Sequence, residues 1–492
     1  MKHKKESEQK RGMLSMADNY IAENLSTVHP TYRHTFHAMP PIGWMNDPNG
    51  FNYAFGKYHL FYQFYPYGAA WDSMHWGHYT TQDFIHWRIE PTALAPDGES
   101  DKDGCFSGTS ILKDGKLYLM YTSVLADIQT QSLAVSFDGI KFEKLGEVIP
   151  TSKRPHGALR TEFRDPKVFL RDGMYYALIG SRTVDGEGQI LLYRSSDLTD
   201  WEYVNAVRKD NLTTRGIYEC PDLFEIAGKD VMLTSPQGYE TKDWRFENWQ
   251  SSIYMVGKLN MQTGVFEKEY EDEIDGGFDF YAPQTLTAPD GRVIMIAWMQ
   301  MWGRRMPTAQ HGWAGSMILP REITLKDGKL YQTPVRELQD YRWNEVKFCN
   351  VPLKEKTVLA GVFGKKVDLS VIFRLGDAKA VGVKLFASGS KYAKIYYDAQ
   401  HDLVVFDRSE MGVEIFHDAK EKDAAVRSVK VSTKGGILTM RIILDIVSCE
   451  VFLNDGERVM TGNVYSGGSE ISFFAEGGNA EIIELVKYDV IK

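Results

Sequence analysis

Three acidic residues occupy similar places in a pattern that recurs along the chain. Asp47, Asp165 and Glu219 lie eight or nine residues before a turn glycine, which is followed by a short strand of aromatic and aliphatic side chains. Ser107 and Pro283 occupy the corresponding positions in two further repeats. Because equivalent positions of a radial fold lie at the same radius, we expect the five to converge, so that two or three carboxyl groups share one pocket.

The neighbours of each acid predict different charge states. Pro48 biases Asp47 toward a stiff, extended geometry that suits a nucleophile. Arg164 would hold Asp165 ionised through its opposite charge. The apolar and aromatic neighbours of Glu219 would favour its protonated form. Taken singly, these residues are better explained as a turn, a surface ion pair and an exposed strand end, but the shared repeat position argues against three coincidences.

Two carboxyl groups of unequal acidity in one pocket suit the hydrolysis of a glycosidic bond. One carboxyl group attacks the sugar or stabilises its developing charge, while the other protonates the leaving oxygen. This chemistry needs a rigid scaffold that brings distant segments of the chain together.

The elements that must position these residues are predicted to be strands. Each turn glycine is followed by a run rich in aromatic and aliphatic residues, as strands are. A second hairpin, such as residues 75–80 with 84–89 in the first unit, completes a four-stranded unit. The runs cover residues 58–62, 117–121, 174–178, 231–233 and 293–297. Five such units from residue 34 to residue 335 predict a five-bladed β-propeller, with a series of unrelated hairpins as the alternative.

The segments outside the repeats predict two further parts. Residues 13–25 have the pattern of a short amphipathic helix, within an N-terminal extension and linker that covers residues 1–33. Alternating strands between residues 350 and 492 predict an antiparallel β-sandwich. The predicted fold is therefore all-β, a five-bladed propeller followed by a sandwich.

Composition limits the partners of the chain. A length of 492 residues is ample for two domains. A net charge of -9 argues against a nucleic acid or an anionic membrane as a partner, because both require a basic surface. No apolar segment follows the basic N-terminus and no run is long enough to span a bilayer, so we expect a cytoplasmic protein.

Metal-binding and redox patterns are weak. The four cysteines have neither the density of a disulfide scaffold nor the spacing of metal ligands, and are expected to be reduced and incidental. His75, His78 and His86 lie in a predicted strand pair without a converging carboxylate, which favours solvated or core histidines. We therefore expect neither a metal ion nor a cofactor.

Seven short motifs resemble those of glycoside hydrolase family 32, the group of invertases, fructanases and sucrose-6-phosphate hydrolases. They are Trp-Met-Asn-Asp-Pro-Asn-Gly at 44–50, Phe-Ser-Gly at 106–108, Arg-Asp-Pro at 164–166, Glu-Cys-Pro at 219–221, Phe-Tyr-Ala-Pro-Gln at 280–284, Leu-Pro-Arg-Glu at 319–322 and Leu-Asn-Asp-Gly-Glu at 453–457. They occur in order through the predicted propeller and into the predicted sandwich. The resemblance implies a retaining β-fructofuranosidase that acts on a small sugar substrate.

The resemblance also implies roles for individual residues. Asp47 would be the nucleophile, Glu219 the general acid and then base, and Asp165 the carboxylate that binds fructose hydroxyls and stabilises the transition state. The residues implied or expected to contact the substrate are Trp44, Asn46, Gln63, Trp71, Phe106, Ser107, Arg164 and Trp302. An ordinary polar strand position is the alternative for Gln63, and core packing is the alternative for Trp71 and Phe106.

The substrate stays open at this stage between sucrose and sucrose 6-phosphate. The alternatives are an exo-fructanase acting on inulin, levan or short fructo-oligosaccharides, a fructosyltransferase, and a sugar-binding propeller without turnover. The last is disfavoured because a binding protein has no need of a protonated glutamate opposite a fixed aspartate. Arg304 and Arg305, expected near the channel mouth, are candidate contacts for a phosphate, although two adjacent arginines on a loop are more often solvated.

Overall fold

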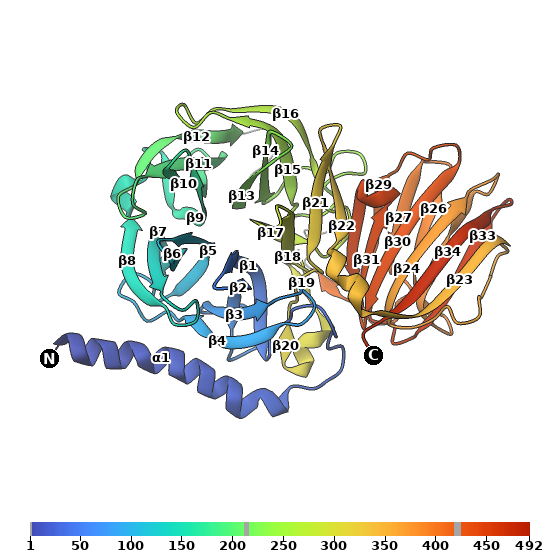
Figure 1. The fold of residues 1–492 in the computed structure, drawn as a ribbon, viewed down its shortest axis with the longest axis horizontal. Helices are drawn as coiled ribbons and strands as arrows, with labels where there is room; N and C mark the ends of the chain where they lie inside the picture. Colours follow the sequence, from blue (N-terminus) through green and yellow to red (C-terminus); the bar gives the residue numbers. More distant parts are fainter. Residues whose placement is uncertain (1, 211–215, 418–424) are drawn as a thin grey trace.

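Five sheets form a ring, and two larger sheets stack beside it (Figure 1). The computed structural model describes residues 2–210, 216–417 and 425–492. Strands dominate these residues, and the one α-helix among them is α1 (Lys2–Asn24). Short 3-10 turns cover Leu25–Thr27, Thr151–Lys153, Pro307–His311, Arg336–Tyr341 and Asn454–Gly456. The predicted all-β fold, a propeller followed by a sandwich, is confirmed.

Each blade of the ring contains four antiparallel strands that pair in chain order. The first blade contains β1 (Gly43–Ala54), β2 (Lys57–Tyr65), β3 (His75–Thr81) and β4 (Arg88–Leu94). The second contains β5 (Gly104–Lys113), β6 (Lys116–Leu125), β7 (Ile128–Ser136) and β8 (Glu143–Ile149). The third contains β9 (Ala158–Arg171), β10 (Met174–Thr183), β11 (Gly188–Ser195) and β12 (Glu202–Asp210).

The last two blades follow the same plan. The fourth contains β13 (Tyr218–Ile226), β14 (Lys229–Pro236), β15 (Ile253–Leu259) and β16 (Phe266–Glu273). The fifth contains β17 (Tyr281–Thr287), β18 (Val293–Trp298), β21 (Arg321–Lys326) and β22 (Lys329–Pro334). Between β18 and β21 the chain leaves the blade, and β20 (Trp313–Ala314) pairs in parallel with β1. In every blade the first strand in the chain lies nearest the centre of the ring (Figure 1).

A β-bulge interrupts the innermost strand of every blade. In β1 the register with β2 shifts between Met45 and Pro48. The matching shifts lie between Phe106 and Gly108, Arg164 and Lys167, Glu219 and Asp222, and Tyr281 and Gln284. Three of the bulges hold a residue with left-handed φ directly before a proline, namely Asp165 (63°), Cys220 (46°) and Ala282 (52°). Because a bulge changes the direction in which side chains point, the repeated bulge turns residues of all five blades toward one centre.

The sandwich packs a six-stranded sheet against a five-stranded one. The first contains β23 (Arg342–Pro352), β34 (Glu481–Val490), β24 (Lys366–Arg374), β30 (Ile437–Asp445), β31 (Ser448–Leu453) and β32 (Arg458–Asn463). The second contains β29 (Val426–Lys430), β27 (Leu403–Asp407), β26 (Lys391–Asp398), β25 (Ala380–Ser388) and β33 (Glu470–Glu476). A two-stranded sheet of β19 (Arg304–Arg305) and β28 (Phe416–His417) joins the propeller to the sandwich.

Buried charges cross the junction between the propeller and the sandwich. Arg321 in the fifth blade pairs with Asp275 at 3.0 Å and with Glu450 of the sandwich at 2.7 Å. His37, which precedes β1, lies between Glu450 at 2.9 Å and Asp445 at 2.8 Å. Burial alone would lower the pKa of His37, but the hydrogen bonds to Asp445 and Glu450 outweigh it and raise that pKa to about 9. The charged imidazolium therefore joins two carboxylates of the sandwich to the segment that leads into the propeller.

Three neighbouring side chains at this junction have the chemistry of metal ligands. Atoms of His34, His37 and Asp445 that could bind a metal ion lie within 4.8 Å of one another. Asp445, however, already accepts hydrogen bonds from the backbone nitrogens of Thr35 and Phe36 as well as the contact from His37. The cluster is thus a hydrogen-bonded anchor of the fold.

The structure differs from the sequence prediction at two elements. The N-terminal helix begins at Lys2 rather than at residue 13. The outer strand of the first blade begins at Arg88 rather than at Phe84, because Phe84 has a left-handed φ of 60° in the preceding turn. No helix among the described residues combines the length and the apolar character that crossing a membrane requires.

The raised pKa of His37 predicts a pH-dependent contribution to stability. A folded pKa of about 9 lies above the ordinary value of 6.5, so this contribution is complete below about pH 6.5 and disappears as the pH rises through 9. We expect His37→Gln to unfold at a lower temperature than the wild type at pH 6, because removing one partner of a buried ion pair costs about 3 kcal/mol or more. The deficit should shrink by pH 10 in thermal unfolding followed by circular dichroism.

His78→Gln is the matched control for this experiment. His78 is also buried, but burial lowers its pKa, so it carries no charge between pH 7 and pH 10. Its effect on the unfolding temperature should stay constant over that range. A constant deficit for His37→Gln as well would contradict a charged His37.

Candidate active site

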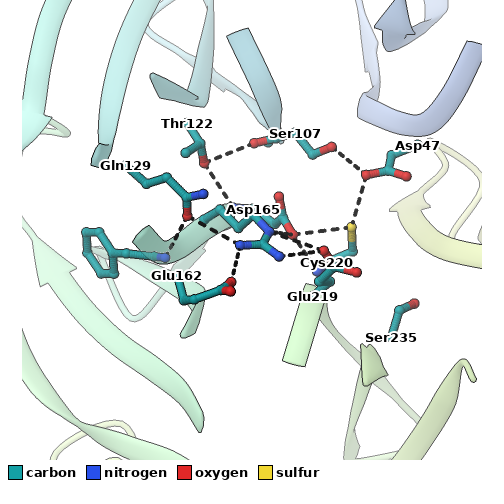
Figure 2. Close-up of polar contacts among 12 residues, drawn as sticks. Asp47, Ser107, Thr122, Gln129, Glu162, Asp165, Glu219, Cys220 and Ser235 are labelled. Carbon is teal, nitrogen blue, oxygen red and sulfur yellow. Dashed lines mark hydrogen bonds and ion pairs between the residues drawn. The ribbon is translucent and has the colours of Figure 1, made fainter. Parts of the chain in front are cut away.

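The five innermost strands enclose a small central cavity. It is lined by residues from every blade, namely Pro48, Asn49, Ser107, Gly108, Asp165, Pro166, Cys220, Pro221, Ala282, Pro283 and Gln284. The five positions that the repeat predicted to converge therefore lie at or beside one centre. Asp47, Asp165 and Glu219 are each in contact there with side chains from other blades (Figure 2).

Asp47 lies in the bulge of β1 and is almost fully buried. Ser107 Oγ donates a hydrogen bond of 2.6 Å to Asp47 Oδ2. The other oxygen, Oδ1, is buried and has no hydrogen-bond partner among the residues that the structure describes. Burial raises the pKa of Asp47, and the hydrogen bond from Ser107 acts in the opposite direction. Oδ2 is thus held in place by a hydrogen bond, whereas Oδ1 has none among the described residues.

Glu219 begins the bulge of β13 and is surrounded by donors rather than by apolar groups. Arg164 donates to Glu219 Oε1 through Nη2 at 2.8 Å and through Nε at 3.2 Å. Tyr281 donates to Oε2 through its hydroxyl at 2.6 Å. The expectation of an apolar setting for Glu219 is therefore wrong, because residues of the neighbouring blades supply polar groups that the local sequence does not contain.

Asp165 differs from the sequence prediction in its electrostatics. Its Oδ2 lies 3.9 Å from Arg164 Nε, whereas the guanidinium is directed at Glu219 and Glu162. Asp165 Oδ2 accepts a hydrogen bond of 3.0 Å from the backbone nitrogen of Cys220. Burial raises the pKa of Asp165 to about 7, more than Arg164 lowers it. The prediction that Arg164 keeps Asp165 ionised is contradicted, since the arginine lies closer to Glu219.

Cys220 and Tyr281 are site residues that the sequence analysis did not single out. The sulfur of Cys220 lies 3.5 Å from Asp47 Oδ2 and 3.6 Å from Asp165 Oδ2 (Figure 2). Burial raises the pKa of its thiol, so the thiol stays protonated and its single hydrogen is available to either carboxyl group. All four cysteines are free, as expected, but Cys220 is not incidental. The signal was its place inside the Glu-Cys-Pro motif, and Tyr281 likewise lies inside the quoted motif at 280–284.

Aromatic rings form one wall beside Asp47. Trp44 Nε1 donates to Asn46 Oδ1 over 2.7 Å, which fixes the residue before Asp47. The ring of Trp302 stacks on Trp44 with centroids 6.1 Å apart. Trp298 packs edge-on against both rings. Trp44, Asn46 and Trp302 thus lie together. Flat aromatic faces such as those of the two tryptophans suit contact with a sugar ring.

The remaining predicted contacts lie on the first two blades. Gln63 is buried and donates to the backbone oxygen of Cys105 at 2.9 Å. Trp71 is 47% exposed and contacts the ring of Phe106 edge-on at 5.8 Å. Core packing therefore does not account for Trp71, whose exposed ring stands beside the strand that carries Ser107.

The two arginines expected near a phosphate do not form an exposed pair. Arg304 is buried, where it donates to Asp279 at 2.9 Å and to Asn248 at 3.1 Å. Arg305 is exposed and lies over the ring of Phe416 in the sandwich. The expectation that Arg304 meets a phosphate is wrong, because this side chain is committed to the junction with the sandwich.

Comparison with known proteins gives consistent matches over the whole chain. The family model described as "Glycosyl hydrolases family 32 N-terminal domain" matches residues 37–334, and "Glycosyl hydrolases family 32 C terminal" matches residues 337–490. A sucrose-6-phosphate hydrolase of Escherichia coli is 37% identical over 484 residues, covering 95% of this chain and 97% of the relative. A raffinose invertase of Escherichia coli is 36% identical, with the same coverage of both chains.

Solved structures agree with these matches. A family 32 β-fructofuranosidase of Bombyx mori superposes with a TM-score of 0.85 at 32% identity, covering 98% of this chain and 99% of that one. A sucrose-6-phosphate hydrolase of Lactobacillus gasseri superposes with a TM-score of 0.85 at 27% identity, covering 96% of each chain.

The raised pKa of Asp165 predicts that its ionisation destabilises the fold. A folded pKa of about 7 lies above the ordinary value of 3.8, so the favourable contribution is complete below pH 3.8 and is lost as the pH rises through 7. We expect the unfolding temperature of Asp165→Asn, relative to the wild type, to be higher at pH 8 than at pH 4.5. Differential scanning calorimetry at the two pH values measures the difference.

Asp279→Asn provides the opposite case. Asp279 is equally buried, but Arg408 and Arg304 lower its pKa despite its burial. Its neutralisation should destabilise the protein by about 3 kcal/mol or more at pH 8, because it removes the carboxylate that pairs with two buried arginines. A loss of stability at pH 8 in Asp165→Asn like that in Asp279→Asn would contradict the raised pKa of Asp165.

Proposed function

The chain belongs to glycoside hydrolase family 32, and from that premise we propose that it is a β-fructofuranosidase that hydrolyses sucrose or sucrose 6-phosphate with retention of configuration. The observation that carries the proposal is the state of Asp47, with one oxygen held by Ser107 and the other buried and unpartnered among the described residues. An attacking carboxylate needs this combination of fixed orientation and a free oxygen.

In the first step Asp47 attacks the anomeric carbon of the fructosyl unit. Glu219 gives a proton to the glycosidic oxygen, the bond from that oxygen to the anomeric carbon breaks, and a covalent fructosyl-enzyme forms. In the second step Glu219, now a carboxylate, takes a proton from water. The resulting hydroxide attacks the anomeric carbon and releases Asp47. Two inversions at one carbon give net retention, so β-fructose is the first product.

The polar residues around Glu219 suit its change of charge. The Arg164 guanidinium and the Tyr281 hydroxyl both face its carboxyl group. They stabilise the carboxylate that remains after the proton has left, without moving, because both are already in place. Arg164 also contacts Glu162, and this second pairing fixes the orientation of the guanidinium.

Asp165 is proposed to bind fructose hydroxyls and to stabilise the charge that develops on the sugar. Its bulge places it beside Cys220 and near Asp47. Ionisation near neutral pH lets the carboxyl group act as an acceptor toward a hydroxyl. Gln63, Trp71, Phe106, Trp44, Asn46 and Trp302 are proposed to line the rest of the substrate site.

Replacing Asp47 by Ala or Glu219 by Gln should each lower kcat by about three orders of magnitude or more, because each removes one member of a unit that acts together. The measurement is release of fructose from sucrose, sucrose 6-phosphate, inulin and levan by the wild type and both variants. We expect sucrose or its 6-phosphate to give the highest kcat/KM, and β-fructose as the initial anomer by NMR. Higher kcat/KM on inulin or levan would instead favour a fructanase.

Both variants should keep the fold, since neither substitution removes a core contact. Unfolding temperatures near the wild-type value are therefore the control. Near-normal kcat in either folded variant would remove that residue from its proposed role. Binding of sucrose by the wild type without release of fructose would point to the sugar-binding propeller.

The contact between Ser107 and Asp47 predicts a shift in the pH profile. Asp47 must be ionised to attack, and the Ser107 hydroxyl stabilises the ionised form. Removing this hydrogen bond in Ser107→Ala raises the pKa of Asp47, so the acidic limb of kcat/KM should move to higher pH, by about one unit. The profile is measured between pH 3.5 and pH 9.

Ser110→Ala is the matched control for Ser107→Ala. Ser110 lies on the same strand, is also buried, and donates a hydrogen bond of 2.8 Å to the backbone oxygen of Gly50. Its loss should leave the acidic limb where it is. An equal movement in both variants would mean that the limb reports the general stability of β5 rather than the charge of Asp47.

A further inference from the structure

The C-terminal half of α1 is fixed to the first blade. The helix runs along β4, the outermost strand of that blade (Figure 1). Ala17 is fully buried. Asp18 Oδ1 accepts hydrogen bonds from the backbone nitrogen of Thr92 at 2.9 Å and from its hydroxyl at 2.7 Å. A helix that only extended the chain into solvent would not need these buried contacts.

The same part of α1 touches the loop between β2 and β3, residues 66–74. The rings of Tyr20 and Tyr67 meet edge-on, with centroids 5.0 Å apart. Tyr67 in turn meets Tyr65 at 5.6 Å. Tyr65 packs against the apolar cluster that contains Trp44. The helix is therefore linked by two ring contacts to the aromatic wall of the active site, through the loop that carries Trp71.

We propose that α1 supports the loop of residues 66–74, and that Tyr20 is a positioning residue that acts on Trp71 through Tyr67. The proposal rests on the proposed function, in which Trp71 contacts the substrate. Trp71 is nearly half exposed, so binding a sugar against its ring must restrict its motion. A loop that is already held in place lowers that entropic loss and tightens binding.

Tyr20→Ala tests the role of the helix in substrate binding. Because an edge-on aromatic contact is modest, we expect KM for sucrose or sucrose 6-phosphate to rise by about two- to tenfold. kcat should change little, since uniform binding is lost rather than transition-state stabilisation. Tyr20→Phe keeps the ring and should keep the wild-type KM.

Tyr53→Ala is the matched control. Tyr53 and Tyr58 also meet edge-on at 5.0 Å, in the same blade, but at the end that carries the Gly56 turn rather than the 66–74 loop. Tyr53 and Tyr20 have the same intermediate burial. Loss of this contact should leave KM unchanged. An equal rise of KM in Tyr20→Ala and Tyr53→Ala would overturn the proposal.

A double-mutant cycle tests whether Tyr20 acts through Trp71. In a Trp71→Ala background, Tyr20→Ala should have little further effect on KM, because the residue that it positions is gone. The same fold-change in both backgrounds would show that Tyr20 acts independently and would refute the positioning role. Tyr67→Ala, which removes the other ring of the contact, should reproduce Tyr20→Ala and replaces it if that variant does not fold.

Hydrogen exchange of the free enzyme separates this proposal from the proposed function. Tyr20→Ala should speed amide exchange in residues 66–74 relative to the wild type and to Tyr53→Ala, whatever substrate the enzyme uses. Unchanged exchange in that loop would contradict the proposal even if the enzyme hydrolyses sucrose. If exchange in the loop is faster in Tyr20→Ala but Trp71→Ala has the wild-type KM, then α1 supports the loop, and Trp71 does not belong to the proposed substrate site.

Discussion

Mutual repulsion among three neighbouring carboxyl groups is the constraint on which the site depends. Burial raises the pKa of Asp47 and of Asp165, and the neighbouring Glu219 carboxyl group raises both further, because like charges repel in a low-dielectric pocket. The structure meets this constraint with donors from neighbouring blades, among them Ser107 and Arg164. Each of the three acids takes a donor from another blade, so the charge balance exists only when the ring is complete.

The repeated bulge explains how a regular sheet directs several side chains of one strand into the central site. Residues of a regular strand point alternately to its two faces, so a strand edge offers few side chains to a central channel. The left-handed residues Asp165 and Cys220 break that alternation. A non-glycine residue in this conformation is strained by about 1–3 kcal/mol, and the surrounding sheet holds it in place. Rigid backbone at these positions is what lets Cys220 face two carboxyl groups at once.

The sequence made the carboxyl groups predictable because their spacing follows the blade repeat and their motifs are specific. The residues that pair with these carboxyl groups were harder to predict from the sequence. Arg164 precedes Asp165 in the chain, yet it pairs with Glu219, 55 residues away, because the bulge separates the directions of adjacent side chains. Cys220 looked incidental, since no local pattern reveals a left-handed φ. Arg304 looked exposed because its buried partners, Asp279 and Asn248, lie in distant segments of the chain that a loop sequence does not record.

The sandwich takes part in placing the proposed nucleophile. The chain enters β1 directly from the segment around His37, and that segment is clamped by Asp445 and Glu450 of the sandwich. At the same end of β1, β20 pairs with Trp44, and Trp302 stacks on the Trp44 ring. Both restraints act within ten residues of Asp47. A buried ion pair contributes little net stability compared with apolar packing, but its directional geometry fixes where a strand begins. The charged junction therefore sets the position of β1, and with it the distance of Asp47 from the carboxyl groups of the other blades.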